Sequence, residues 1–252
     1  MMEIILMGTA CAASGIDRDN TYLLLREFES GTLIDVGGNP LGKLKSLAIP
    51  TNHIKRLLFT HFHNDHIYGL PSLLWGMWID GRTEPFDIYC VEERREWLEN
   101  WLDLMELNEW PCLFEIRIHS FNWKEPSLIW SSNDCSLSIF PASHGDVPTV
   151  GVEAIYHNKV VIYSADTILN PTITRYEKID LLIHEATTAR NAMPTHSSLE
   201  DIVGFYNMDA IEKLVLVHLM DDEPYEEVLN QLPAGTLSKI TMGQDLLSIS
   251  LQ

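Results

Sequence analysis

The sequence is poor in positive charge and in long apolar runs. Its 252 residues contain 17 lysines and arginines against 36 aspartates and glutamates, a net charge of −19 with the histidines neutral. Such an acidic chain should repel polyanions, so extended nucleic-acid binding is not expected. No apolar run approaches the ~18 residues that span a bilayer, and Glu3 interrupts the segment where a secretory signal would place its apolar stretch. We therefore expect neither a membrane protein nor a secreted one.

Cysteines are few and unpaired in the sequence. The four lie at Cys11, Cys90, Cys112 and Cys135, and no two form a Cys-x-x-Cys pair, so a cysteine zinc site has no support. Free thiols are typical of a reducing compartment, which predicts a cytoplasmic protein. The chain has 46% hydrophobic residues and shows no repeat, low-complexity segment or linker. It therefore predicts a single domain over residues 1–252.

Short apolar runs bounded by turn residues predict a layered α/β domain. Strands are expected at Glu3–Met7, Thr21–Leu25, Thr32–Val36, Leu57–Phe59, Phe86–Val91, Ser136–Pro141, Gly151–Tyr156, Val160–Ser164, Leu181–His184 and Lys213–Val217. Helices are expected at Ile67–Ile79, Glu92–Leu107, Ser198–Asn207 and Glu223–Gln231. This order favours sheets packed together with helices outside, although periodicity by itself also allows a doubly wound parallel sheet.

Three imidazoles and a carboxylate lie within one short segment. The residues Thr60-His61-Phe62-His63-Asn64-Asp65-His66 come directly after the apolar run Leu57–Phe59. A strand that runs into a loop can direct such alternating side chains toward one point. Imidazole and carboxylate groups are the ligands that zinc, manganese or iron prefer at hydrolytic centres, so the segment predicts a metal site.

More ligand-type residues lie where later strands are expected to end. His144 follows the strand at Ser136–Pro141, Asp166 follows the strand at Val160–Ser164, and His218 follows Lys213–Val217. Each residue alone is better explained by capping or packing than by metal binding. Together with the four side chains at 61–66 they form a set of seven, which is too many for one tetrahedral ion and suits two ions that share a carboxylate.

The pattern His-x-His-x-Asp-His with a later His, Asp and His resembles the metallo-β-lactamase fold, a four-layer αββα sandwich of the α/β class. Within that superfamily the chain is similar to ribonuclease Z and its small cyclic-phosphodiesterase relatives over most of its length. The similarity is carried by Gly8-Thr9, Arg18-Asp19-Asn20-Thr21, Gly69–Leu74, Gly81–Tyr89, His184-Glu185-Ala186-Thr187 and Thr195-His196-Ser197-Ser198.

This resemblance implies a role for each ligand-type residue. One ion would bind His61, His63 and His144, the other would bind Asp65, His66 and His218, and Asp166 would bridge the two. The ions are expected to be zinc, although the same nitrogen and oxygen ligands accept manganese or iron. The resemblance implies that His196 donates a proton to the leaving oxygen and that Glu185 orients His196. It also implies that Asp65 accepts a hydrogen bond from a hydroxide shared by the ions, and that His184 is not a ligand.

A hydroxide held between two divalent ions would attack a small or cyclic phosphodiester, so we expect a binuclear phosphodiesterase. Two alternatives are open: a ribonuclease Z-like RNA endonuclease lacking the tRNA-binding arm, and a lactonase or other ester hydrolase on the same centre. The tRNA-processing enzymes insert that arm between the positions of His144 and Asp166, and only 22 positions separate these residues here. The short interval favours a small-molecule substrate.

Trp75 and Trp78 follow the metal segment at helical spacing. They can form an aromatic wall for a nucleobase or sugar, or can simply pack in the core, and the spacing does not decide between these interpretations. The family resemblance also implies that a homodimer can form.

Overall fold

A computed structural model describes residues 2–28, 30–107 and 113–251. These residues group into two compact units, each assembled from separate stretches of the chain. Unit 1 comprises Met1–Gly8, Asp19–Asn122 and Asp245–Gln252, and unit 2 comprises Thr9–Arg18 and Trp123–Gln244. The prediction of one domain over 1–252 stays a prediction.

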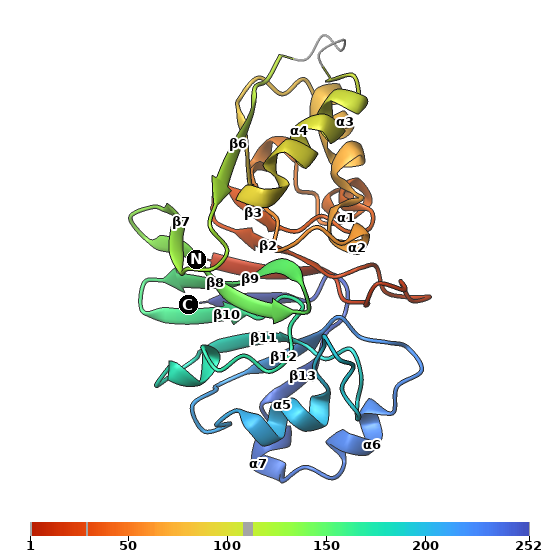
Figure 1. Cartoon of the computed structure of the whole chain (residues 1–252), viewed down its shortest axis with the longest axis vertical. Helices are drawn as coiled ribbons and strands as arrows, with labels where there is room; N and C mark the ends of the chain where they lie inside the picture. The colour runs from red at the N-terminus through yellow and green to blue at the C-terminus, as the bar shows by residue number, and fades with distance from the viewer. Residues whose placement is uncertain (1, 29, 108–112, 252) are drawn as a thin grey trace. The chain divides into compact units, whose positions relative to one another are not determined.

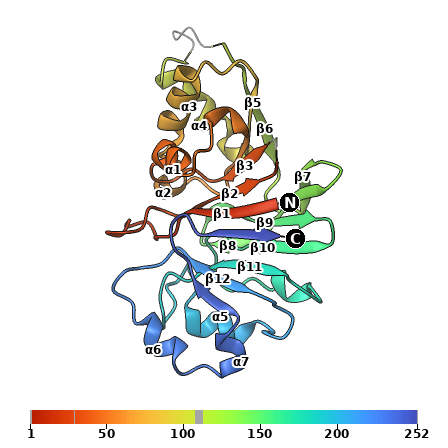
Figure 2. The same cartoon turned by 180° about the vertical axis from the view of Figure 1, so that it is seen from behind.

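Unit 1 is built on a seven-stranded mixed sheet of order β14-β1-β2-β3-β4-β5-β6. Its strands are β1 (Met2–Gly8), β2 (Tyr22–Arg26), β3 (Gly31–Ile34), β4 (Ile54–Leu58), β5 (Phe86–Val91), β6 (Ile116–Phe121) and β14 (Ser248–Leu251). The strands from β14 to β3 pair antiparallel, and those from β3 to β6 pair parallel. The two ends of the chain therefore lie on neighbouring strands, β1 and β14, as Figures 1 and 2 show.

Helices pack against this sheet through one apolar core. They are α1 (Pro40–Ser46), α2 (Asn64–Ile67), α3 (Leu70–Ile79) and α4 (Arg95–Leu104), with short 3₁₀ segments at Thr51–His53 and Glu92–Arg94. Leu44 of α1, Leu73 of α3 and Leu98 of α4 join Leu33 and Leu57 of the strands in that core. Each such leucine is buried and contributes at most about 1.5–3 kcal/mol by leaving water.

The helix expected at Ile67–Ile79 is wrong at its start, because the chain forms two helices there. α2 ends at Ile67 and α3 begins only at Leu70, with Gly69 between them. The backbone N–H of Gly69 donates to the carbonyl oxygen of Val36 at 2.8 Å, and a Cβ at this position would lie 2.5 Å from the same oxygen. A close contact between backbones, possible only for glycine, therefore sets the break.

Unit 2 is built on a second seven-stranded sheet, of order β13-β12-β11-β10-β9-β8-β7. Its strands are β7 (Ser127–Ser131), β8 (Cys135–His144), β9 (Val147–Tyr156), β10 (Lys159–Tyr163), β11 (Leu181–Glu185), β12 (Leu214–Val217) and β13 (Ile240–Met242). The strands from β7 to β10 form antiparallel hairpins, and those from β10 to β13 are parallel. Consequently β8, β10, β11 and β12 all run in the same direction.

The helices of unit 2 are α5 (Leu199–Phe205), α6 (Tyr225–Leu229) and α7 (Ala234–Leu237), with a 3₁₀ segment at Ile173–Arg175. Ser198 caps α5, since its hydroxyl accepts a hydrogen bond from the backbone N–H of Asp201. Leu199 and Ile202 of this helix pack on Leu182 and Leu214 of the sheet. The expected helices at 198–207 and 223–231 are confirmed, with each end shorter by one or two residues.

Among the described residues all ten expected strands are present, whereas the helices α1 and α7 and the strands β6, β7, β13 and β14 were not predicted. β6 and β7 are edge strands whose side chains are mostly exposed or only half-buried, and β13 has three residues. Such segments carry too few buried positions for a clear apolar pattern. Among the described residues, every helix is too short or too polar to cross a lipid bilayer.

Candidate metal centre

In unit 1 the segment predicted to bind metal, residues 60–66, lies at the carboxyl ends of two parallel strands. β3 and β4 pair side by side up to Ile34 and Leu58, so the residues that follow them emerge at the same edge of the sheet. Thr60 and His61 follow β4, and His63 immediately precedes α2. Asp65 and His66 lie inside α2 and are buried. One edge of this sheet therefore carries the whole segment.

The four ligand-type side chains of this segment lie close together. The ring centres of His61 and His63 are 4.7 Å apart, and those of His61 and His66 are 4.1 Å apart. Nε2 of His66 lies 3.3 Å from a carboxylate oxygen of Asp65. Imidazole nitrogens and a carboxylate oxygen are thus gathered as a cation would require.

Asp35 is a buried carboxylate to which the sequence analysis gave no role beyond a place in the expected strand Thr32–Val36. It follows β3 with a left-handed backbone (φ 63°), a conformation that costs about 1–2 kcal/mol outside glycine. Oδ1 accepts from the backbone N–H of Thr60 at 2.8 Å. Oδ2 accepts from the Thr60 hydroxyl at 2.7 Å and from Nδ1 of His66 at 2.8 Å. Burial raises the pKa of the Asp35 carboxyl, and these donors oppose that effect.

In unit 2 the predicted residues share one edge of the sheet for the same reason. His144 ends β8, Asp166 follows β10, and His218 follows β12, three strands that run in the same direction. Nε2 of His218 lies 3.2 Å from Oδ2 of Asp166, and Nε2 of His144 lies 3.9 Å from the same oxygen. The carboxylate of Asp166 therefore stands between two imidazoles, as a shared ligand would.

Glu185, the last residue of β11, joins this edge as a buried hydrogen-bond acceptor. Its Oε1 accepts from Nδ1 of His196 and from the backbone N–H of Ser197, both at 3.0 Å. Its Oε2 accepts from the backbone N–H of Thr187 at 3.0 Å and from the Thr187 hydroxyl at 2.9 Å. The His196 ring stacks on that of His218 with centres 5.1 Å apart. Glu185 is thus in place to orient His196.

The ring nitrogens of His184 bind protein groups on either side of the ring. It is fully buried, its Nδ1 lies 2.6 Å from the carbonyl oxygen of Glu185, and its Nε2 lies 3.1 Å from the Tyr206 hydroxyl. Burial lowers the pKa of the imidazole, which favours the neutral ring. Both nitrogens are engaged in hydrogen bonds, and the expectation that His184 is not a ligand stays a prediction.

In both units the side chains at the predicted positions have the chemistry that divalent cations require. Four of the histidines use Nδ1 for a neighbour: His61 toward Thr60, His66 toward Asp35, His144 toward the Thr195 carbonyl, and His218 toward Thr187. Histidines that bind metals are commonly held in this way through the second ring nitrogen. The Nε2 atoms of His66, His144 and His218 then lie near a carboxylate oxygen of the expected ligand set.

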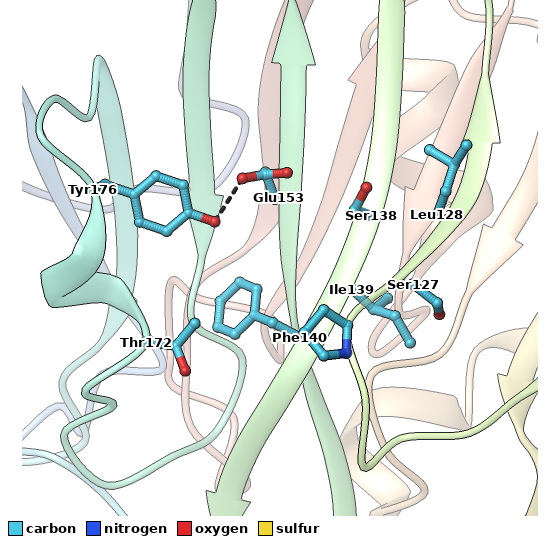
Figure 3. A pocket seen from close by; sticks show the side chains of 9 residues that line it. Ser127, Leu128, Ser138, Ile139, Phe140, Glu153, Thr172 and Tyr176 are labelled. Carbon is cyan, nitrogen blue, oxygen red and sulfur yellow. Dashed lines mark hydrogen bonds between the residues drawn. The ribbon is translucent and has the colours of Figure 1, made fainter.

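A cavity of about 370 Å³ in unit 2 is lined by none of the predicted site residues. Figure 3 shows its walls, formed by β7, β8, β9 and the segment around Thr172 and Tyr176. The Tyr176 hydroxyl donates to Glu153 at 2.5 Å, and a Cβ at Gly151 would lie 2.3 Å from the ring of Phe140.

The two tryptophans of α3 have different environments. Trp78 packs against the core of unit 1, whereas Trp75 is 41% exposed. Their ring centres lie 4.7 Å apart. Core packing therefore accounts for Trp78 and only partly for Trp75.

Known proteins resemble this chain over most or all of its length. The ribonuclease Z of Methanocaldococcus jannaschii is 24% identical over all of this chain and 98% of its own length. That of Methanococcus aeolicus is 25% identical over 86% of this chain and 84% of its own. The structure of the short form of human tRNase Z covers both chains completely with a TM-score of 0.80 and 20% identity. A diphosphatase of the PhnP family gives a TM-score of 0.78 at 19% identity, over 100% of this chain and 98% of its own.

These similarities show the metallo-β-lactamase fold and its ribonuclease Z-like branch, which confirms the αββα fold class and the resemblance expected from the sequence. A more specific match comes from the family model of the anti-Pycsar protein Apyc1, which covers residues 2–237. The chain belongs to this family.

Proposed function

We propose that this protein is a binuclear metal-dependent phosphodiesterase that hydrolyses small or cyclic phosphodiesters. The observation that carries the proposal is the orientation of four buried imidazoles, each engaged through Nδ1 by a protein group. The metal ligands would be His61, His63, Asp65, His66, His144, Asp166 and His218. Two bound divalent ions, zinc in the first instance, would supply an activated water and stabilise negative charge on the phosphate.

The remaining chemistry belongs to the chain's own residues. His196 would give a proton to the leaving oxygen from Nε2, because its Nδ1 is bonded to the buried Glu185 carboxylate. Glu185 would act as the positioning residue for His196. Asp65 would accept a hydrogen bond from the attacking water. Its position beside His66, with Oδ2 3.3 Å from Nε2, supports a place at the reacting centre.

The hairpins of unit 2 support a small substrate. Between His144 and Asp166 the chain forms only β9 and β10, with a turn at Gly145-Asp146 between β8 and β9 and a turn at His157-Asn158 between β9 and β10. This stretch of chain is therefore too short to include an inserted arm that grips tRNA. The net charge of −19 also disfavours a broad contact with a polyanion.

An RNA endonuclease is the second candidate, because the curated relatives with full-length similarity are named ribonuclease Z. Their identity to this chain is 23–24%, and the neighbouring structures include a diphosphatase as well as a tRNase. A lactonase is less favoured, because opening an ester does not need a proton donor arranged as His196 is.

The test measures bound metal and turnover in one purified sample. We expect about two ions per chain, EDTA-sensitive cleavage of bis(p-nitrophenyl) phosphate, and hydrolysis of 2′,3′-cyclic or other cyclic nucleotides. Parallel assays with a tRNA precursor and with a lactone separate the other candidates. Faster cleavage of the precursor than of every cyclic nucleotide would favour the nuclease. Metal binding with lactone hydrolysis alone would favour the lactonase.

A further inference from the structure

In unit 2 a threonine hydroxyl stands between a carboxylate and a histidine. Oγ1 of Thr187 lies 2.9 Å from Oε2 of Glu185 and 2.8 Å from Nδ1 of His218. All three residues are buried. The hydroxyl therefore has two partners on opposite sides of one short chain of hydrogen bonds.

The chemistry of these groups fixes the direction of the bonds. An ionised carboxylate only accepts, so the single hydroxyl proton of Thr187 goes to Glu185. The hydroxyl oxygen can then only accept from His218, and Nδ1 of His218 must carry a proton. In a neutral imidazole with Nδ1 protonated, Nε2 has the lone pair, and this is the atom 3.2 Å from Asp166.

Unit 1 contains the same arrangement, built from other residues. Oγ1 of Thr60 donates to Oδ2 of Asp35 at 2.7 Å and lies 3.1 Å from Nδ1 of His61. In both units the same carboxylate also binds a second histidine directly. Asp35 bonds His66, and Glu185 bonds His196. Each carboxylate thus controls one imidazole by contact and another through a hydroxyl.

We propose that Thr60 and Thr187 are positioning residues that set the proton on Nδ1 of His61 and His218, so that Nε2 of each ring is available to a divalent cation. The proposal deepens the proposed function and rests on it for the presence of the cation. It assigns to two hydroxyl groups a role in metal affinity that does not require contact with metal or substrate.

Valine and serine separate the hydroxyl from the shape of the side chain. Thr187→Val keeps the branched shape and removes the hydroxyl that links Glu185 to His218. Thr187→Ser keeps that hydroxyl. Loss of such an outer partner typically lowers metal affinity 10–100-fold. We therefore expect the valine variant to bind zinc about 10–100-fold more weakly in competition with a chelator, and the serine variant to bind like wild type. Thr60→Val and Thr60→Ser should behave in the same way.

Thr188 is the matched control, because it is the next residue and is also buried. Its hydroxyl makes no hydrogen bond among the described residues, so Thr188→Val should leave zinc affinity unchanged. A spectroscopic readout is the Nδ1 proton of His218 in long-range ¹H–¹⁵N spectra of the zinc-loaded protein. We expect it to be protected from exchange in wild type and Thr187→Ser, and to lose this protection in Thr187→Val.

The outcomes separate this inference from the proposed function. If Thr187→Val binds zinc as tightly as wild type, or if Thr187→Ser binds it as weakly as Thr187→Val, the proposed role of the hydroxyl is wrong. The proposed metal centre is not affected by either result. A wild-type chain that binds no zinc overturns both. Thermal unfolding of the metal-free variants identifies loss of fold, in which case the serine and Thr60 variants decide.

Discussion

Nδ1 of His196 donates to Oε1 of Glu185 at 3.0 Å, although the two residues are eleven positions apart and Glu185 is buried at the end of a strand. The His196 side chain is 14% exposed, whereas that of Glu185 is 1% exposed. The carboxylate holds Nδ1, so Nε2 is the nitrogen that would donate a proton in the function proposed above.

Replacing His196 by alanine should therefore impair proton donation more than metal binding. We expect the variant to keep its metal content and to lose about 10²–10⁴-fold in turnover of a diester with a poor leaving group. Cleavage of bis(p-nitrophenyl) phosphate should fall much less, since its leaving group needs no proton. Comparable losses on both substrates would count against His196 as the proton donor.

Glu185→Gln should lower the free energy of unfolding as well as the rate of turnover. An amide oxygen cannot replace both carboxylate oxygens, which together accept from Thr167, Thr187, His196 and Ser197. We expect the free energy of unfolding in urea to fall by about 1–3 kcal/mol. Glu200→Gln, at the exposed start of α5, is the control and should change stability much less. Unchanged stability of Glu185→Gln would contradict the importance of this acceptor.

His184 should make stability depend on pH. Burial lowers the pKa of its imidazole in the folded state, whereas the unfolded chain has an ordinary histidine with a pKa of about 6.5. Below that pH the unfolded state binds the extra proton, so this contribution is present near neutral pH and is lost as the pH falls.

The measurement compares urea unfolding of metal-free protein at neutral and mildly acidic pH. Wild type should lose stability toward acid, and His184→Gln should lose less between the same two pH values because it lacks the titrating group. An identical pH dependence in the two proteins would refute this prediction.

Arg82 should contribute to the stability of the fold, since its guanidinium is buried in unit 1. It donates to the backbone carbonyl oxygens of Ile54, Glu84 and Pro85 at 2.7–2.9 Å. Arg82→Met leaves these oxygens without their donors, and we expect a loss of about 3–5 kcal/mol in the free energy of unfolding. Arg117→Met, at an exposed arginine of β6, is the control. A loss below 1 kcal/mol for Arg82→Met would show that the guanidinium is not needed.

The sequence could predict which residues form the site, because most of these residues directly follow a strand. His61, His144, Asp166 and His218 each come at or just after the end of an apolar run, and parallel strands bring such ends to one edge of a sheet. Asp35 also follows a strand, but a lone carboxylate beside glycines gives no signal that separates a hydrogen-bond acceptor from a turn residue.

Helix boundaries and edge strands were less predictable. The break at Gly69 depends on Val36, more than thirty positions earlier in the chain, and periodicity within α3 cannot report it. β14 does alternate exposed serine with buried Ile249 and Leu251, but four residues are too few to distinguish from chance.

The sequence by itself determined most of the strands, the helices α4, α5 and α6, and which imidazoles and carboxylates stand at strand ends, because those features depend on the spacing of neighbouring residues. Tertiary structure alone decided which nitrogen each imidazole presents. That choice depends on the hydrogen bonds that Asp35 accepts from Thr60 and His66, and that Glu185 accepts from Thr187 and His196. The direction of such a bond is set by the group that can only accept, and only the folded chain brings that group to the ring.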